Sequence, residues 1–147
     1  MEFNSQICTT REQSERLLSL GLKKETADMV HYRSSSMKEW GILAMPWRGD
    51  CEGCKCYYPA WSLHRLIEMM PKCVMAHSIG DDSPRLHPYV PKFDYRGVTI
   101  ENIDEILADF YEHTDLFDNI IDCIEWLIKE GYFNKEFWGG RNEATHQ

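Results

Sequence analysis

The sequence predicts an α+β fold, formed as a single helix-dominated domain over residues 1–147 with a small antiparallel sheet. Three patterns lead to this prediction. Apolar side chains recur at helical spacing from Phe117 to Ile128, which indicates a long amphipathic helix. A capping-box pattern opens a second apolar segment at residues 9–20. Two short apolar runs flank the turn-forming residues 80–84, as in a β-hairpin.

Residues 9–32 are predicted to form a helical hairpin. The first helix has capping-box spacing at its start, in Thr9–Glu12 or Thr10–Gln13. Gly21 can end that helix because glycine readily adopts the left-handed conformation that follows a helix. Residues 23–32 supply the second helix. A DNA-reading helix-turn-helix would need a cationic second helix. Here two acidic residues offset the lysines, so we expect simple packing of two helices.

Residues 34–58 show no sustained periodicity and predict an irregular connection with one short strand near residues 40–45. A connection of this length is unusual within a compact domain, which indicates a functional or internally braced segment. Pro59 then suits the first turn of a helix that ends at Pro71.

The strands of the small sheet are predicted at residues 73–79 and 86–95, on either side of the 80–84 turn. Pro88 and Pro91 would confine the second strand to a sheet edge or a bulge, because proline has no N–H to donate to a neighbouring strand.

Two further helices are predicted toward the C-terminus. Ile103 to Phe110 has the spacing of an amphipathic helix, and a longer helix begins after Asp115 as its cap and ends at Gly131. The aromatic residues between 132 and 138 are expected to fold back on the core.

The net charge of −8 lies in the second half of the chain. Residues 1–74 hold ten Lys/Arg and nine Asp/Glu, whereas residues 75–147 hold six and fifteen. An acidic half repels phosphate backbones, so no nucleic acid is expected as a partner. It would suit another protein with a basic surface. The alternative is an acidic face that only contacts solvent.

No apolar run approaches the roughly 18 residues that a membrane helix needs. Residues 1–13 also lack the basic start and apolar stretch of a signal peptide. We therefore expect a cytoplasmic protein without a membrane partner. Its six cysteines are then expected to be free thiols, because the cytosol is reducing.

The stretch CEGCKC, residues 51–56, is the strongest candidate for chemistry. A structural zinc site needs about four ligands, and the candidate ligands are Cys51, Cys54, Cys56, Cys73 and His77. Redox chemistry of the thiols is a further alternative. Our interpretation is a loop with reactive thiols and no cofactor, and zinc is the alternative that it must be tested against.

No catalytic residue is predicted. The chain contains no Walker A loop, GxGxxG turn, HExxH helix or GxSxG elbow. His64 and Glu68 have the spacing of an acid–base pair on one helix, and we interpret them as a surface contact.

Three blocks of the sequence resemble small proteins encoded on phages and mobile elements of gut anaerobic bacteria. They are CTTREQSERLLSLGLKKETADMV at 8–30, PAWSLHRLIEMMP at 59–71 and FDNIIDCIEWLIKEGYFNKEF at 117–137. That group has no established activity, so the resemblance implies a genomic setting and no mechanism. The CEGCKC stretch lies outside the three blocks.

Three hypotheses of function follow. The first is a non-catalytic accessory protein of a mobile element, which binds another protein through its acidic half or an aromatic groove. The second is a small zinc-stabilised binding module that uses Cys51, Cys54 and Cys56. The third is a small enzyme of unidentified class, which no motif supports. The oligomeric state is not predicted.

Overall fold

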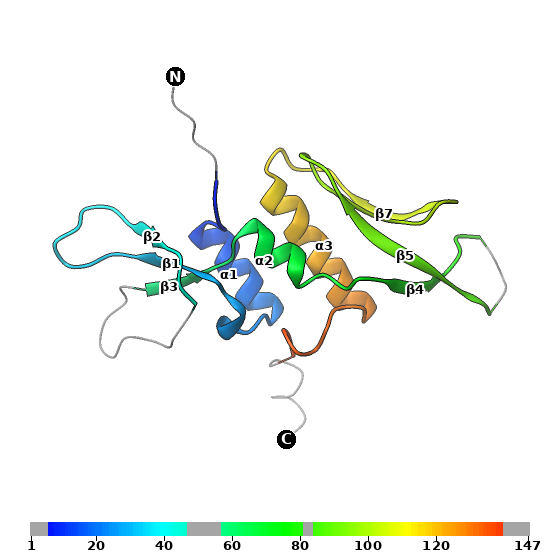
Figure 1. Ribbon diagram of the computed structural model, residues 1–147, viewed down its shortest axis with the longest axis horizontal. Helices are drawn as coiled ribbons and strands as arrows, with labels where there is room; N and C mark the ends of the chain where they lie inside the picture. Colours follow the sequence, from blue (N-terminus) through cyan, green and yellow to red (C-terminus); the bar gives the residue numbers. More distant parts are fainter. Residues whose placement is uncertain (1–5, 47–56, 81–83, 140–147) are drawn as a thin grey trace. The chain divides into compact units, whose positions relative to one another are not determined.

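The computed structural model describes residues 6–46, 57–80 and 84–139. The chain divides into two compact units. Unit 1 comprises Met1–Met69 with Lys135–Gln147, and unit 2 comprises Met70–Asn134. Each unit has its own antiparallel sheet (Figure 1). In the described ranges strands and helices hold similar numbers of residues, so the fold is α+β as predicted, but it is not helix-dominated.

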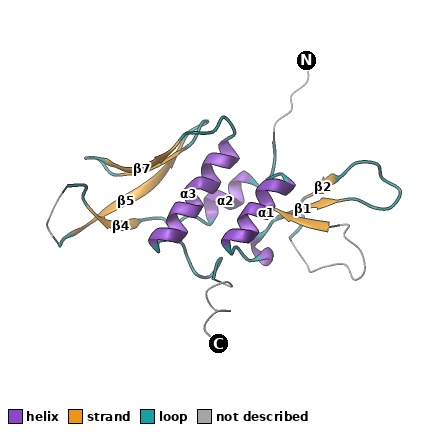
Figure 2. Cartoon of the chain, turned by 180° about the vertical axis from the view of Figure 1, so that it is seen from behind, coloured by secondary structure: helices purple, strands orange, loops and turns teal. Residues whose placement is uncertain are grey.

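Unit 1 combines short helices with a three-stranded sheet of order β2-β1-β3 (Figure 2). Its elements are α1 (Arg11–Leu20), the 3-10 turn η1 (Lys24–Thr26), β1 (Met29–Tyr32), β2 (Gly41–Leu43), β3 (Tyr57–Ala60) and α2 (Leu63–Glu68). The described part of the predicted irregular connection thus contains the expected short strand, β2. It also contains the first two residues of β3.

The first predicted helix is confirmed, with its end at Leu20 as expected and its start at Arg11 instead of residue 9. Thr10 and Gln13 form the capping box, in which the Gln13 N–H donates to Thr10 Oγ1 over 3.1 Å and the Thr10 N–H donates to Gln13 Oε1 over 3.0 Å. Gly21 ends α1 with a φ of 106°. A β-carbon there would also lie 2.5 Å from Trp138 Nε1. That indole donates to the Leu20 carbonyl oxygen over 2.5 Å, so the aromatic tail does fold back, onto unit 1.

The prediction of a second helix in the hairpin, at residues 23–32, is wrong. Residues 29–32 form β1, the central strand, which pairs with both β2 and β3. The β-branched Val30 and the aromatic Tyr32 pack against cross-strand neighbours there, which overrides a weak helical period. The predicted helix from Pro59 also begins late, at Leu63, and ends at Glu68. Pro59 lies in β3, an edge strand, where a missing N–H is tolerated.

Unit 2 is a four-stranded antiparallel meander of order β4-β5-β6-β7, followed by a helix that packs on β6 and β7. Its elements are β4 (Val74–His77), β5 (Leu86–Phe93), β6 (Val98–Glu101), β7 (Ile106–Phe110) and α3 (Leu116–Glu130). The buried side chains of the sheet include Val74, Tyr89, Val98 and Ile100. We call the face that carries them the inner face and the opposite one the outer face.

Strand β5 carries two prolines although it lies between two other strands. Residues 86–89 pair only with β4, and residues 90–93 pair only with β6. Pro88 therefore has no strand-pairing partner in β6, although the Asn102 side chain donates to its carbonyl oxygen over 3.3 Å, and Pro91 has none in β4. Each half of β5 is thus locally an edge, which is the position that proline tolerates.

The prediction of a helix from Ile103 to Phe110 is wrong, because most of these residues form strand β7. Asn102 Oδ1 accepts the N–H groups of Asp104 and Glu105, each over 2.9 Å. This tight turn sends the chain back along β6, where pairing across the strands determines the conformation.

The C-terminal helix is confirmed. Asp115 accepts the Phe117 N–H over 2.9 Å at its start, and Gly131 ends it with a φ of 82°. The predicted apolar stripe is largely inaccessible, with five fully or nearly fully buried residues: Phe117, Ile120, Ile121, Ile124 and Leu127.

Candidate protein-interaction surface

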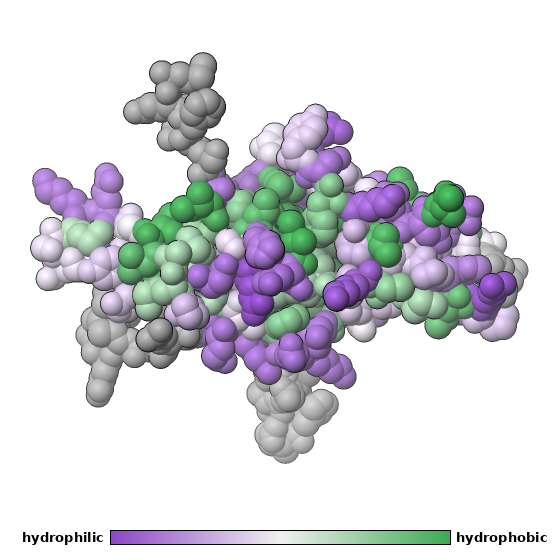
Figure 3. Space-filling model, in the orientation of Figure 1, coloured by the Kyte–Doolittle hydropathy of each residue, from purple (hydrophilic) through white to green (hydrophobic). Residues whose placement is uncertain are grey.

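The outer face of the unit 2 sheet is unusually apolar for an exposed surface. Because successive residues of a strand point to opposite faces, the positions next to the buried ones in β4 and β5 face outward. Ile106 of β7 is placed on the same face by its pairing with Glu101, next to a register shift at Ile100/Glu101 that interrupts the alternation. Four large apolar side chains there are exposed by 38–50%: Met75, Leu86, Val90 and Ile106. We call these four residues the outer patch. Figure 3 shows isolated hydrophobic areas among hydrophilic ones over this sheet.

The strand register places one carboxylate between two members of the outer patch. Val90 of β5 pairs with Glu101 of β6, and Glu101 pairs with Ile106 of β7. Glu101 therefore lies between two apolar side chains. One strand further, Met75 of β4 pairs with Pro88 of β5. The members of the patch thus lie on β4, β5 and β7, and β6 contributes the Glu101 carboxylate between Val90 and Ile106.

Glu101 is held in its charged form. The Thr99 hydroxyl donates to Glu101 Oε1 over 2.5 Å, and Lys92 Nζ lies 3.5 Å from Oε2. The Thr99 hydrogen bond, with a smaller effect of the Lys92 charge, lowers the pKa of this carboxyl below its ordinary value. A partner that covers the patch must therefore accommodate a carboxylate that is paired with Lys92, because a buried charge is costly unless it stays paired.

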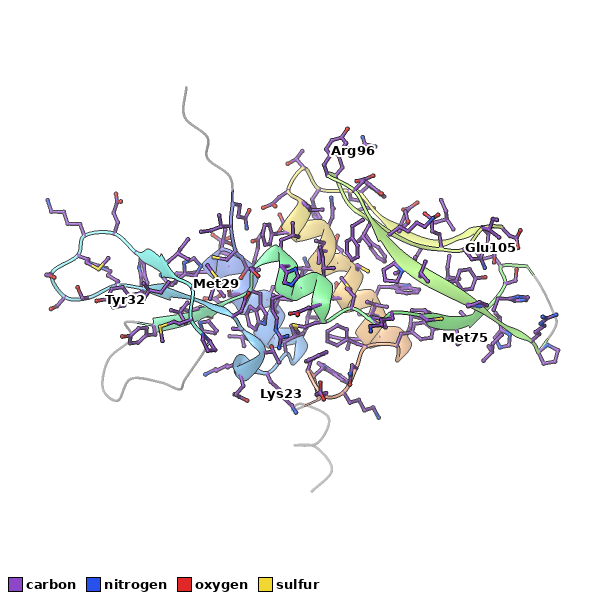
Figure 4. All side chains as sticks on the ribbon, viewed as in Figure 1. Lys23, Met29, Tyr32, Met75, Arg96 and Glu105 are labelled. Carbon is purple, nitrogen blue, oxygen red and sulfur yellow. The ribbon has the colours of Figure 1, made fainter. Side chains whose placement is uncertain are left out.

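A second carboxylate fastens the end of the sheet beside the patch. Glu105 Oε2 accepts hydrogen bonds from the Tyr89 hydroxyl, from the Ser78 hydroxyl over 2.9 Å and from the Ile79 N–H over 3.2 Å. We call this arrangement the Glu105 clamp. The Tyr89 bond, followed by the Ser78 bond, lowers the pKa of Glu105. Figure 4 shows Glu105 and Met75 toward the end of the sheet that lies away from Arg96.

The net negative charge of the chain comes from the unit that carries the patch. Residues 70–134 hold five Lys/Arg and thirteen Asp/Glu, a net charge of −8, whereas the rest of the chain holds eleven of each. On the outer face itself Asp109 is exposed beside Thr99. On the described outer face the charged strand residues thus include Glu101, Asp109 and one lysine, Lys92.

Of the predicted zinc ligands, Cys51, Cys54 and Cys56 lie outside the described residues. Cys73 is exposed just before β4, with its Sγ 3.9 Å from Met75 Sδ, and His77 is exposed at the end of β4. Positions four apart in a strand are separated by about 13 Å, so β4 does not present these two as neighbouring ligands. In the described ranges no group of three or more His, Cys, Asp or Glu could hold a metal ion.

The other residues singled out in the sequence have structural positions. His64 Nε2 lies 3.8 Å from Glu68 Oε2, and both side chains are at least half exposed, as expected of a surface contact. Cys8 and Cys123 are buried, and burial raises their thiol pKa values to about 11 and about 12. Such thiols are protonated and unreactive at neutral pH.

Sequence reasoning did not predict the ion pairs of Lys92 and His113 or the patch itself. His113 Nε2 lies 2.9 Å from Asp122 Oδ2. This pair joins the loop before α3 to the helix, which no local pattern indicates. The buried Asn119 donates to the His113 and Arg96 carbonyl oxygens over 2.9 and 2.7 Å and thereby fastens the same loop. The patch was missed because residues 103–110 were assigned to a helix.

Comparison of the chain with protein-family models, with curated proteins and with solved structures finds no match. None of the helices in the described ranges has the length and apolar character needed to cross a bilayer.

Proposed function

We propose that this chain is a non-catalytic interaction protein that binds another protein through the outer patch. The observation that carries the proposal is the set of exposed apolar side chains at paired positions on one sheet face. Exposed apolar side chains grouped on one face and rimmed by polar residues are typical of interaction sites. The partner surface would combine apolar side chains with Lys or Arg, because Glu101 lies within the patch and the surrounding unit is acidic.

A second copy of the chain is disfavoured as the occupant. Two outer faces brought together would place two Glu101 carboxylates and two units of charge −8 against each other. Like charges at an interface cost several kcal/mol by the usual estimate. A basic partner replaces this repulsion with attraction.

The proposed setting is that of an accessory protein of a mobile element. It rests on the resemblance of the three sequence blocks at 8–30, 59–71 and 117–137, and it is independent of the patch argument.

Two peptide-display libraries test the proposal. One is built from Leu, Ile, Val, Lys and Arg, and the other has Asp and Glu in place of the cations. Peptides recovered on the purified chain are synthesised and titrated by fluorescence anisotropy. We expect binders from the basic library, and we expect Ile106→Glu to weaken them at least about tenfold. The matched control is Ile7→Glu, which introduces the same charge in unit 1 at a similarly exposed isoleucine (54% against 50%).

The proposal fails if neither library yields a binder, or if the acidic library performs as well as the basic one. It also fails if Ile106→Glu and Ile7→Glu have equal effects on affinity. Circular dichroism of both variants must match the parent for the comparison to count.

A further inference from the structure

We infer that the segment seated on the outer patch is an amphipathic helix whose apolar stripe carries a Lys or Arg opposite Glu101. This inference rests on the proposed function and names the partner class for the same surface. It is argued from the width of the patch, from the backbone pairing of the sheet and from the position of Glu101.

The width of the patch matches one helix. Val90 and Ile106 lie two strands apart, which corresponds to about 10 Å, and β4 adds about 5 Å more. A helix with its side chains is about 10–12 Å across. An apolar stripe at i, i+3, i+4 and i+7 can therefore contact both side chains at once. The sheet already packs a helix, α3, against β6 and β7.

Addition of a strand is a poorer fit to the same surface. Strand addition uses unpaired backbone groups at a sheet edge, whereas the outer patch consists of side chains on a sheet face. The patch is thus suited to side-chain packing.

Glu101 determines the charge within the stripe. It pairs with Val90 on one side and Ile106 on the other, so a helix that covers both also covers the carboxylate. Lys92 Nζ lies 3.5 Å from Glu101 Oε2, and the Lys92 side chain is 64% exposed. A partner Lys or Arg can place its methylene stem among the apolar side chains and its charge at Glu101.

Synthetic peptides of about four helical turns (~14 residues) test the inference. The parent has a Leu stripe, Lys on its flanks and one Lys in the centre of the stripe. The second peptide has Leu at the central position. The third has the composition of the parent with two central D-residues that break the helix. Each is titrated by fluorescence anisotropy against the full chain and its Glu101→Gln and Asp109→Asn variants. Asp109→Asn removes a carboxylate from the polar end of the same face.

We expect the parent peptide to bind most tightly and the D-residue peptide to bind at least about tenfold more weakly. Glu101→Gln should weaken the parent about tenfold and leave the Leu-centred peptide within about threefold. Asp109→Asn should have the smaller effect on both.

Equal affinities of the parent and D-residue peptides would show that the bound segment need not be helical. If Ile106→Glu weakened both peptides in that case, the proposed function would still stand. If Glu101→Gln changed the affinities of the Lys-centred and Leu-centred peptides equally, the inference of a cation opposite Glu101 would be overturned. If no designed peptide binds while library peptides do, the inference fails and the proposed function stands. If neither kind binds, both fail.

Discussion

Glu105 joins parts of unit 2 that are not neighbours in the sheet. Its carboxylate is supplied by the turn between β6 and β7, whereas Ser78 and Ile79 follow β4, two strands away from β6 in the order β4-β5-β6-β7. Tyr89, on the inner face of β5, reaches the same oxygen. One side chain therefore fixes the end of the sheet where Ile79 and Ile103, among the most exposed large apolar residues, are found.

Glu105→Gln should change how stability depends on pH. The pKa of Glu105 is lowered in the folded chain by its hydrogen bonds to Tyr89 and Ser78. A lowered pKa contributes stability that is fully present above the ordinary glutamate value of 4.5 and is lost as the pH falls through the folded-state value. We expect urea midpoints measured from pH 7 downward to fall less steeply below 4.5 in Glu105→Gln than in the parent.

Asp104→Asn is the matched control for that measurement, since it neutralises the adjacent, exposed carboxyl. Its pH profile should follow the parent. Parallel profiles for the parent and Glu105→Gln would show that the clamp contributes nothing to folding.

At the scale of elements, α3 was predictable and β7 was not, although both carry apolar residues at helical spacing. In α3 the local signals agree, because the Asp115 cap, the stripe and the Gly131 stop all favour a helix. Residues 103–110 follow a cap-like residue, Asn102, but no glycine stops the stripe at its end, and pairing with β6 determines the structure. The same non-local pairing turned residues 29–32 into β1. Strand register between distant segments leaves too weak a local trace to be recognised in one sequence.

Ile124→Ala should lower the free energy of unfolding by about 2–5 kcal/mol, the range for a large-to-small change in a core. The reason is that Ile124 is fully buried in α3. Ile106→Ala removes the same atoms from a half-exposed site of β7 and should cost less than about 0.5 kcal/mol. Chemical denaturation measures both. Similar losses would mean that burial does not distinguish the two positions.

At the scale of the whole chain, the acidic charge could be predicted from the sequence, but the surface that carries the patch could not. The acidic second half, read from composition alone, coincides with unit 2, so the expectation of a basic partner could be formed before the fold was known. The surface for that partner could not, because it requires the register of four strands. The thiols of CEGCKC remain a sequence-based prediction.

The six cysteines should divide into two classes on brief treatment of the native chain with iodoacetamide. Cys8 and Cys123 should stay unmodified, because burial shields them and raises their pKa values. Cys73, which is exposed, should react quickly. For Cys51, Cys54 and Cys56 the loop interpretation predicts fast reaction as well. Peptide mass spectrometry reports each site.

The zinc alternative predicts the opposite for the CEGCKC thiols. Stoichiometric zinc in protein purified without chelator, together with protection that a chelator removes, would contradict the loop interpretation. Cys54→Ser would then lower the melting temperature as much as chelation does, because metal binding and local folding are one equilibrium.

The divided pairing of β5 has a consequence for cooperativity. Since β4 pairs with residues 86–89 and β6 with residues 90–93, no backbone ladder crosses the middle of β5. The β4 half could open locally while the β6–β7 half stays paired, as in other locally unfolding segments. The outer patch spans this boundary, with Met75 and Leu86 on one side and Val90 and Ile106 on the other. A partner bound there would hold both halves closed, so occupancy and the rigidity of β5 would rise together.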